Sequence, residues 1–258
     1  MDNPPTLSPR LKALADLVPV GKTVADIGTD HAALPIYLVE LGLISAAVAT
    51  EKAAGPYRVA LTQVQKSRVA HRIAVRLGDG LTPLEEGEAE VIVLAGMGAG
   101  TIISILEGDP GKSSSADRIL AQPMAGSEKL RAWIREKGCL LNEEIVREGG
   151  RLYEIEVFRT GRANEVFPAM AWARSLPPEW RTGAGMALIF GLGPILLAKR
   201  HPLFPALLEE KIRQWERILT VLEKGRGGKI GQKKEELLSR LQLARRLHNC
   251  WSEETPVR

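Results

Sequence analysis

The sequence predicts an α/β fold in which a mainly parallel sheet ends in an antiparallel pair of strands and is followed by a C-terminal helical hairpin. Three observations support this class. Short apolar runs alternate with helical patterns from residue 24 to residue 137. Two later strand patterns are joined by a short segment with paired glycines, Gly149-Gly150, which is typical of a β-hairpin. From residue 202 onward, apolar residues recur instead at spacings of three and four, as in paired helices with a coiled-coil-like seam.

The elements follow in order along the chain. The first helix is predicted over residues 7–18, because apolar residues recur there at helical spacing and Ser8-Pro9 is a suitable cap and first turn. The further helices are expected at 36–43, 56–67, 101–107 and 127–137. The strands are expected at 24–27, 46–50, 73–78, 91–95, 118–122, 143–147 and 153–158. Residues 109–115, which read Asp-Pro-Gly-Lys-Ser-Ser-Ser, are expected to form a loop.

Three parts of the chain are expected. Residues 1–160 form the sheet domain, residues 161–201 form a connector that packs on it, and residues 202–258 form the helical hairpin, with a helix stop and turn at residues 225–228. The helical stripe on residues 208–222 and 237–251 is expected to be packing surface, so any function of the hairpin lies on its outer faces.

The composition excludes several classes of protein. The 258 residues contain no run of about eighteen apolar residues, which predicts that no transmembrane helix forms. The polar N-terminus shows no signal-peptide pattern. The two cysteines, Cys139 and Cys250, are far apart and do not have metal-ligand spacing, so no metal site is expected. A cytoplasmic location and a monomeric state are the corresponding expectations.

Positive charge is concentrated at the C-terminal end. Residues 1–198 carry 21 Lys and Arg against 23 Asp and Glu, whereas residues 199–258 carry 14 against 8, so the whole positive excess lies in the last part. This asymmetry is consistent with a polyanionic partner or with an ordinary solvated helix face.

Three acidic residues follow successive predicted strands. Asp26 lies at the end of the first strand, Glu51 follows the second and Asp79 follows the third. Parallel strands place these ends at one edge of the sheet, where open α/β folds bind nucleosides. A carboxylate at the second position can accept hydrogen bonds from both ribose hydroxyls, and one at the third can accept from an adenine amino group.

The glycine pattern distinguishes two cofactors. A dinucleotide needs Gly-x-Gly-x-x-Gly, since its pyrophosphate lies on bare backbone N–H groups. Here Gly28 is present but Asp30 stands at the second glycine position, where it would repel a pyrophosphate and suits an ammonium group. S-adenosylmethionine (SAM) is therefore favoured over a dinucleotide. A glycine turn without a ligand is the structural alternative.

The motifs resemble those of the bacterial TrmK-type tRNA (adenine(22)-N1)-methyltransferases. The matching segments are residues 26–35 (DIGTDHAALP), 55–56 (GP), 95–101 (AGMGAGT), 122–123 (QP) and 190–197 (FGLGPILL). Met124 is a departure, because the family is expected to have Asn there. The resemblance implies a Rossmann-like SAM methyltransferase sheet, SAM as cofactor, and tRNA as partner, with the methyl group transferred to N1 of the adenine at position 22.

Site residues are assigned on the motifs and the strand ends. The expected cofactor-binding residues are Asp26, Gly28, Thr29, Asp30, His31, Glu51, Lys52, Gly78, Asp79, Gly80, Ala95, Gly96 and Met97. The expected substrate-binding residues are Gly98, Gln122, Pro123, Lys211, Arg213, Arg217, Lys233, Lys234, Arg245 and Arg246. Asp30 is the candidate catalytic residue, because a carboxylate would stabilise the charge that develops on an adenine methylated at N1; binding of the cofactor ammonium is its alternative role.

The segment after the fourth strand bears on the reaction. Its glycines could cradle a phosphate, but in methyltransferases this loop meets the target base. Enzymes that methylate exocyclic amines often carry Asp/Asn-Pro-Pro-aromatic there, whereas this chain has Ala95-Gly96-Met97-Gly98. The pattern favours attack by a ring nitrogen. Two other functions stay open: a SAM methyltransferase for a non-RNA substrate with the tail as an oligomerisation hairpin, and a catalytically silent RNA-binding protein.

Overall fold

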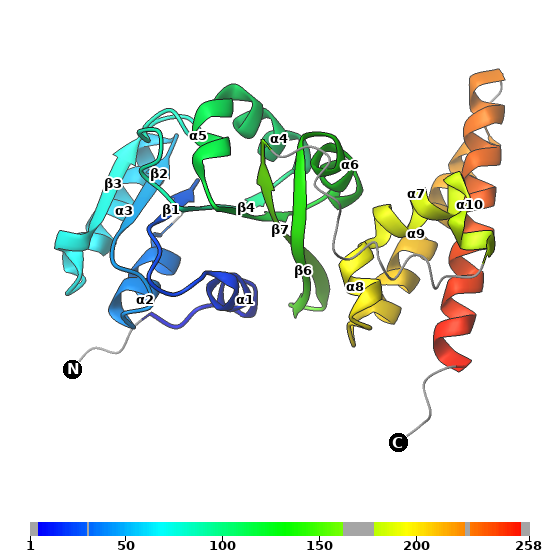
Figure 1. Ribbon diagram of the computed structural model, residues 1–258, viewed down its shortest axis with the longest axis horizontal. Helices are drawn as coiled ribbons and strands as arrows, with labels where there is room; N and C mark the ends of the chain where they lie inside the picture. The colour runs from blue at the N-terminus through cyan, green and yellow to red at the C-terminus, as the bar shows by residue number, and fades with distance from the viewer. Residues whose placement is uncertain (1–4, 30, 162–177, 225–227, 254–258) are drawn as a thin grey trace. The chain divides into compact units, whose positions relative to one another are not determined.

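The computed structural model describes residues 5–29, 31–161, 178–224 and 228–253 (Figure 1). The chain divides into two compact units, residues 1–167 and residues 168–258. Each unit is described by itself.

The first unit is built on a seven-stranded sheet with the order β3-β2-β1-β4-β5-β7-β6. Its strands are β1 (Val24–Ile27), β2 (Ala47–Glu51), β3 (Ile73–Leu77), β4 (Val91–Met97), β5 (Arg118–Pro123), β6 (Gly138–Glu148) and β7 (Arg151–Thr160). The first five strands are parallel, while β7 is antiparallel to both β5 and β6. The predicted sheet with its antiparallel last pair is confirmed.

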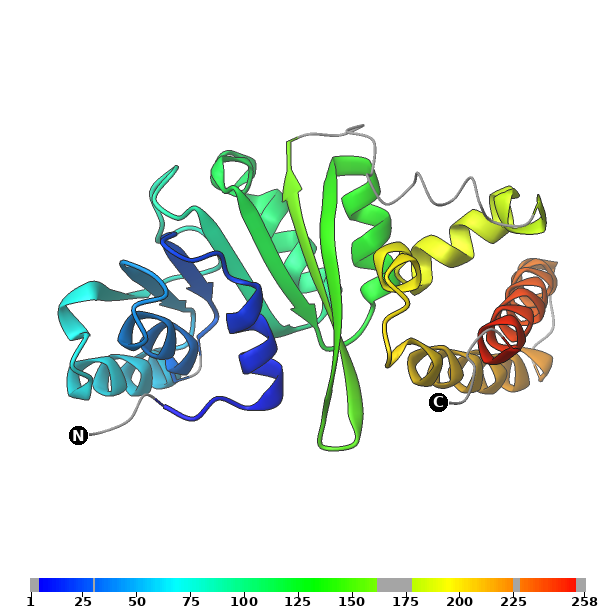
Figure 2. The same ribbon diagram turned by 60° about the horizontal axis from the view of Figure 1, so that its bottom comes forward.

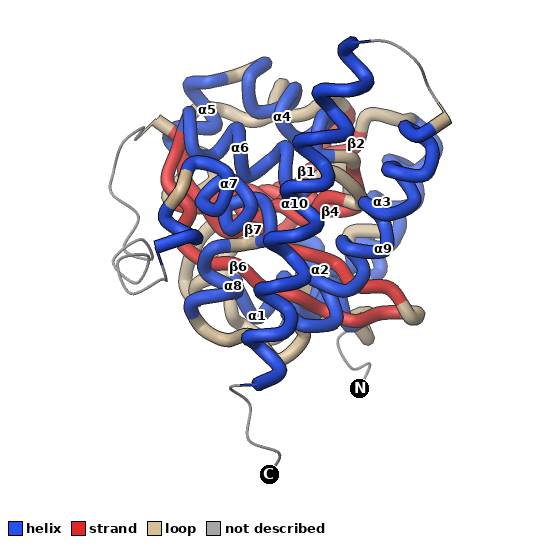
Figure 3. Tube along the Cα trace, turned by 90° about the vertical axis from the view of Figure 1, so that its right-hand side faces the viewer, coloured by secondary structure: helices blue, strands red, loops and turns tan. Residues whose placement is uncertain are grey.

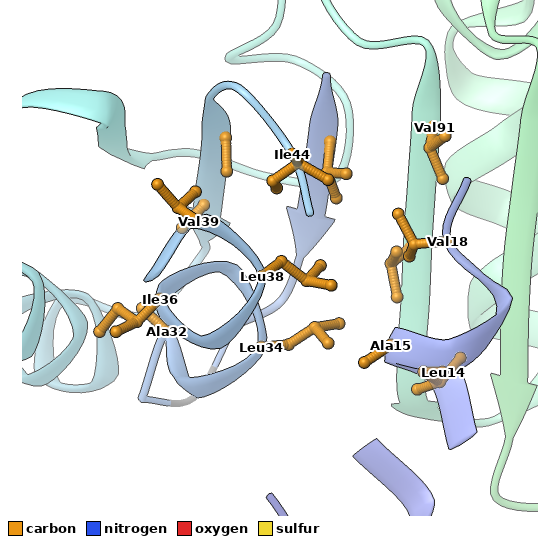
Figure 4. Close-up of a cluster of buried hydrophobic side chains, with 14 of the residues drawn as sticks. Leu14, Ala15, Val18, Ala32, Leu34, Ile36, Leu38, Val39, Ile44 and Val91 are labelled. Carbon is orange, nitrogen blue, oxygen red and sulfur yellow. The ribbon is translucent and has the colours of Figure 1, made fainter. Parts of the chain in front are cut away.

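Helices cover both faces of this sheet (Figure 1). One face carries α1 (Pro9–Leu17), α2 (Ala33–Glu40), α3 (Ala54–Lys66) and the short turn η1 (Ala70–Arg72), and the other carries α4 (Ala99–Gly108), α5 (Pro110–Ser115) and α6 (Ser127–Lys137). Figure 4 shows the core on the first face, where Leu14 and Val18 of the α1 segment face Leu34 and Leu38 of α2. All four side chains are buried.

Local sequence explains where the helices begin. Ser8 caps α1, as expected, because its Oγ accepts the Leu11 N–H at 3.4 Å and Pro9 occupies the first turn. The prediction of a loop at residues 109–115 is wrong, because α5 (Pro110–Ser115) forms there. Asp109 accepts the Lys112 N–H at 3.3 Å and Pro110 starts the helix, so Asp-Pro is a cap and first turn rather than a break.

The last two strands form a long hairpin, which Figure 2 shows. A buried ionic cluster joins this hairpin to α6. Arg131 of α6 is fully buried and lies 2.6 Å from Glu143, 2.8 Å from Glu154 and 3.2 Å from Glu156. Glu143 and Glu156 are direct cross-strand partners, a like-charge pair that is unfavourable by itself. The guanidinium offsets this repulsion and fixes α6 on the hairpin.

The second unit is helical. It contains the turn η3 (Pro178–Arg181) and the helices α7 (Gly183–Leu192), α8 (Pro194–Ala198), α9 (Phe204–Glu223) and α10 (Gly228–Glu253). The helices α9 and α10 pack along one another, as Figure 3 traces, and the Phe204 and Trp251 rings lie 4.9 Å apart. Residues 225–227 of the expected turn lie outside the described residues.

The division into units differs from the three parts expected. The described part of the connector, from η3 to α8, groups with α9 and α10, and α7 packs on α10. Gly185 of α7 allows this end of the unit to pack closely, because a Cβ there would lie 2.6 Å from the Trp180 carbonyl oxygen.

Candidate functional site

The first loop of the site follows β1 at the carboxyl edge of the sheet. The N–H groups of Gly28 and Thr29 both donate to the Thr50 carbonyl at 2.9 Å, which ties the loop to β2. Gly28 has φ +73°, and a Cβ there would lie 2.6 Å from the Met97 Cε. Since β1 lies between β2 and β4, this contact is at the point where the strand order reverses, the usual binding position in open α/β sheets.

Asp26 is a buried acid within β1, just before this loop. Only 8% of its surface is exposed, and burial raises its pKa from 3.8 to about 6, with the Thr29 hydroxyl opposing the shift by donating a hydrogen bond. The Glu51 carboxylate raises the pKa further. The Thr29 Oγ also accepts the Ala32 N–H at 3.2 Å, so the acid and the start of α2 are held together.

The second and third strands bring two further acids to the same edge. The Glu51 side chain, at the end of β2, accepts the Ala53 N–H at 2.9 Å and is partly exposed. The adjacent Lys52 forms an ion pair with Asp79 at 2.6 Å, and both side chains are more than half exposed. The Gly78 N–H donates to the Glu51 carbonyl at 2.9 Å, and Gly80 has φ +55°. The three predicted acids are therefore on adjacent strand ends.

The fourth-strand loop carries a bulge. The pairing of β4 with β5 shifts between Ala95 and Met97, and Gly96 between them has φ +77°. The Met97 carbonyl accepts the Met124 N–H at 2.7 Å, and Gly98 then caps α4 without a side chain. Met97 is the apolar wall nearest to the Gly28 loop.

Gln122 and Pro123 end β5 beside this bulge. The Gln122 side chain is fully buried, its Oε1 accepts the Gly96 N–H at 3.2 Å, and its Nε2 donates to the Pro123 carbonyl at 2.9 Å. In this arrangement the amide supports the loop and does not face solvent. Sequence reasoning missed Arg10, whose Nη1 donates to the same Oε1 at 2.6 Å. The only local signal was a basic residue next to a capped helix start.

Several expected site residues cannot be placed in this group. Asp30 lies outside the described residues. His31 is exposed at the end of the first loop. The seven basic residues expected to bind substrate are all on the second unit, on α9 and α10: Lys211, Arg213, Arg217, Lys233, Lys234, Arg245 and Arg246. Among the described residues of these two helices, Arg213 pairs with Glu209, Lys234 with Glu223, and Arg245 with Glu216.

The edge of β1 to β4 fits a nucleoside cofactor with a short charged tail. It combines exposed and buried carboxylates with Gly28, where the absence of a Cβ leaves room for the Met97 side chain. In the sequence after β1, Asp30 stands where a dinucleotide site needs its second glycine to accommodate a pyrophosphate. The described residues contain no group of His, Cys, Asp and Glu arranged to hold a metal ion. None of the described helices is long and apolar enough to cross a membrane.

Comparison with known proteins identifies the family of this chain. Residues 7–155 match the family described as Methyltransferase domain. The chain is 33% identical over 239 residues to the tRNA (adenine(22)-N(1))-methyltransferase of Bacillus subtilis strain 168, covering 92% of this chain and 94% of the relative. The chain belongs to the tRNA (adenine(22)-N1)-methyltransferase family.

Solved structures of this family have the same fold. The crystal structure of the B. subtilis m1A22 tRNA methyltransferase TrmK has a TM-score of 0.79 and 31% identity, covering 94% of this chain and 99% of that one. A Streptococcus pneumoniae protein proposed to be a tRNA (m1A22) methyltransferase, solved in complex with S-adenosyl-L-methionine, has a TM-score of 0.72 and 30% identity, covering 94% and 100%. The family resemblance and the Rossmann-like methyltransferase fold expected from the sequence are confirmed.

Proposed function

We propose that this protein transfers a methyl group from SAM to N1 of an adenine in tRNA, at position 22 as in its named relatives. The observation that carries the proposal is the carboxyl edge of β1, β2 and β3, where Asp26, Glu51 and Asp79 flank glycine turns next to the Met97 loop. The 33% identity to a named tRNA (adenine(22)-N(1))-methyltransferase, over 92% of the chain, supports the substrate.

Different residues of this edge are proposed to bind different parts of the cofactor. Glu51 is expected to accept hydrogen bonds from the ribose hydroxyls, and Asp79 to accept one from the adenine amino group. Asp26 and Thr29 fix the first loop, which is expected to hold the methionine end with Asp30. The other backbone contacts of the cofactor are expected from Gly28, Gly78, Gly80 and Gly96.

When bound, SAM supplies an electrophilic methyl group on a sulfonium centre. The adenine N1 is neutral at pH 7 and has a lone pair, so this chain needs no strong base to form the nucleophile. Its task is to align the base with the methyl group in a dry pocket, which can account for about 7–11 kcal/mol of the barrier. Met97 and the small residues around it form the wall that a bulky base can approach. Asp30 is proposed to stabilise the positive charge that develops on the ring.

The second unit is proposed to bind tRNA. Within the described part of the chain, the exposed residues Arg217 and Lys233 have no ion-pair partner. They can therefore bind a phosphate without first breaking an ion pair with a glutamate. The contacts would be to backbone phosphates, which fix register without reading sequence. The pairing of α9 with α10 is proposed to be a coiled-coil-like support for this surface. We also propose that the protein is a cytoplasmic monomer.

The reaction is tested by incubating unmodified tRNA with the protein and SAM and analysing nucleosides by mass spectrometry against isomer standards. We expect N1-methyladenosine. N6-methyladenosine, or no modified adenosine, would refute the assignment. A requirement for NADH in place of SAM would exclude SAM as the cofactor.

The RNA surface is tested separately with charge-reversal variants of the full chain. Each of Arg217→Glu and Lys233→Glu is expected to weaken tRNA binding. Each should also make the slope of log binding constant against log salt concentration shallower, by about 0.7–0.9 for each phosphate that is no longer neutralised. Lys66→Glu makes the same charge change on an exposed position of α3 and is the matched control. If all three variants weaken binding equally, the effect is one of net charge and the second unit is not the RNA surface.

A further inference from the structure

The α1 helix is connected to the fourth-strand loop through one buried amide. The Arg10 Nη1 donates to the Gln122 Oε1 at 2.6 Å, and the Gly96 N–H donates to the same oxygen at 3.2 Å. The guanidinium and the bulge therefore share a single acceptor.

The orientation of this amide is determined by its surroundings. The Gln122 Nε2 donates to the Pro123 carbonyl at 2.9 Å, and the side chain is fully buried. A flipped amide would direct its NH₂ group at two donors, Arg10 and Gly96, which is unfavourable in a buried position. A charge-assisted bond from Arg10 strengthens the observed orientation.

Residues of the β6–β7 hairpin fix the position of Arg10. Its backbone N–H donates to the Glu148 Oε2 at 2.8 Å, its Nε lies 4.0 Å from the same oxygen, and its guanidinium lies over the Tyr153 ring at 5.6 Å from the centroid. The Ser8 hydroxyl donates to that carboxylate as well, at 3.1 Å. The guanidinium thus has a defined position between α1, β5 and the end of the β6–β7 hairpin.

We propose that Arg10 is a positioning residue for methyl transfer. Through Gln122 it fixes the Gly96 N–H, and with it the bulge that sets how far Met97 and Gly98 project toward the Gly28 loop. Arg10 touches no reacting atom. The inference rests on the proposed function, in which this loop meets the target base, and a loop displaced by about 1 Å can cost on the order of 100-fold in rate.

The test compares Arg10→Met, which removes the donors, with Arg10→Lys, which retains a charged donor, in the full chain. Lys12→Met on the same helix is the control, because Lys12 forms its ion pair with Asp16, one turn further along the exposed face of α1. The readouts are hydrogen–deuterium exchange of residues 94–100, the single-turnover methylation rate on tRNA, and SAM affinity by calorimetry. Circular dichroism and the thermal midpoint establish that each variant is folded.

Arg10→Met is expected to speed exchange at Gly96 and to lower the single-turnover rate by about 10- to 100-fold, with SAM affinity changed by less than about twofold. Arg10→Lys is expected to lie between Arg10→Met and the unchanged protein, and Lys12→Met to match the unchanged protein.

Three outcomes would overturn the proposal: unaltered exchange and rate in Arg10→Met, a loss of SAM affinity in proportion to rate, or an equal effect in Lys12→Met. If the unchanged protein fails to methylate tRNA, the proposed function is wrong, whereas the exchange readout at Gly96 still decides whether Arg10 holds the loop.

Discussion

Replacement of Asp26 by Asn is expected to stabilise the cofactor-free protein while weakening cofactor binding. The pKa of Asp26 is raised from 3.8 to about 6, mainly by burial. This difference corresponds to about 3 kcal/mol of unfavourable free energy when the buried carboxylate is ionised. Asn is neutral and still accepts a hydrogen bond from Thr29, so Asp26→Asn should raise the free energy of unfolding at pH 7.5 by about 1–3 kcal/mol.

The effect of Asp26→Asn on the free energy of unfolding should depend on pH. Because the folded protein binds the proton more tightly than the unfolded chain, the stability that Asp26 contributes is fully present below about pH 3.8 and is lost as the pH rises through about 6. The advantage of Asp26→Asn should therefore fall by about half at pH 5 and nearly vanish at pH 4. Urea denaturation of both cofactor-free proteins at pH 7.5, 5 and 4 measures this difference in the free energy of unfolding.

The control is Asp117→Asn, because the pKa of Asp117 is shifted in the opposite direction. Hydrogen bonding with Lys22 lowers the pKa of Asp117, so its neutralisation should not stabilise the protein at pH 7.5. Calorimetry of SAM binding completes the experiment, and Asp26→Asn should bind more weakly because the first loop loses its buried charge. A variant less stable than the unchanged protein at pH 7.5, or a gain independent of pH, would refute the reasoning.

Three further predictions concern single residues. Glu51→Ala should weaken SAM binding by about 1.5–3 kcal/mol for each charged hydrogen bond removed, and calorimetry that shows equal affinity would exclude the ribose contact. Arg131→Met should lower the free energy of unfolding in urea by about 3–5 kcal/mol, because buried carboxylates lose their cation; a change below about 1 kcal/mol would mean that the cluster is not a stabilising unit. Asp30→Asn should lower the single-turnover rate more than it lowers SAM affinity, and proportional losses would leave Asp30 as a cofactor ligand only.

The sheet was predictable because its signals are local. Each parallel strand is a short apolar run between helical patterns, and Gly149-Gly150 marks the turn of the antiparallel pair. The acids at strand ends followed from the same rule, since parallel strands expose their carboxyl ends at one edge. The motif at residues 26–35 then pointed to the family that the comparisons confirm.

What the sequence could not show depends on contacts between distant residues. Arg10 and Gln122 are 112 positions apart, so no pattern around either one reveals their hydrogen bond. Gln122 was expected to bind substrate because Gln122-Pro123 matches a motif of the family, and that motif does not reveal that the amide is buried and accepts the Gly96 N–H. The α5 helix was missed because Asp109-Pro110 is compatible with both a turn and a helix start.

The contact between the start of α1 and Glu148 has a consequence for biosynthesis. The Arg10 backbone and the Glu148 carboxylate are 138 positions apart, and β7 must still pair beside β6 to complete the sheet. A chain leaving the ribosome exposes α1 long before its anchor exists, and domains generally fold as units during synthesis. The Gly96 loop, which depends on that anchored helix, is therefore completed only after most of the first unit has been translated. Truncated chains released earlier would contain Asp26, Glu51 and Asp79 of the proposed cofactor site and lack the support of the loop that is proposed to meet the base.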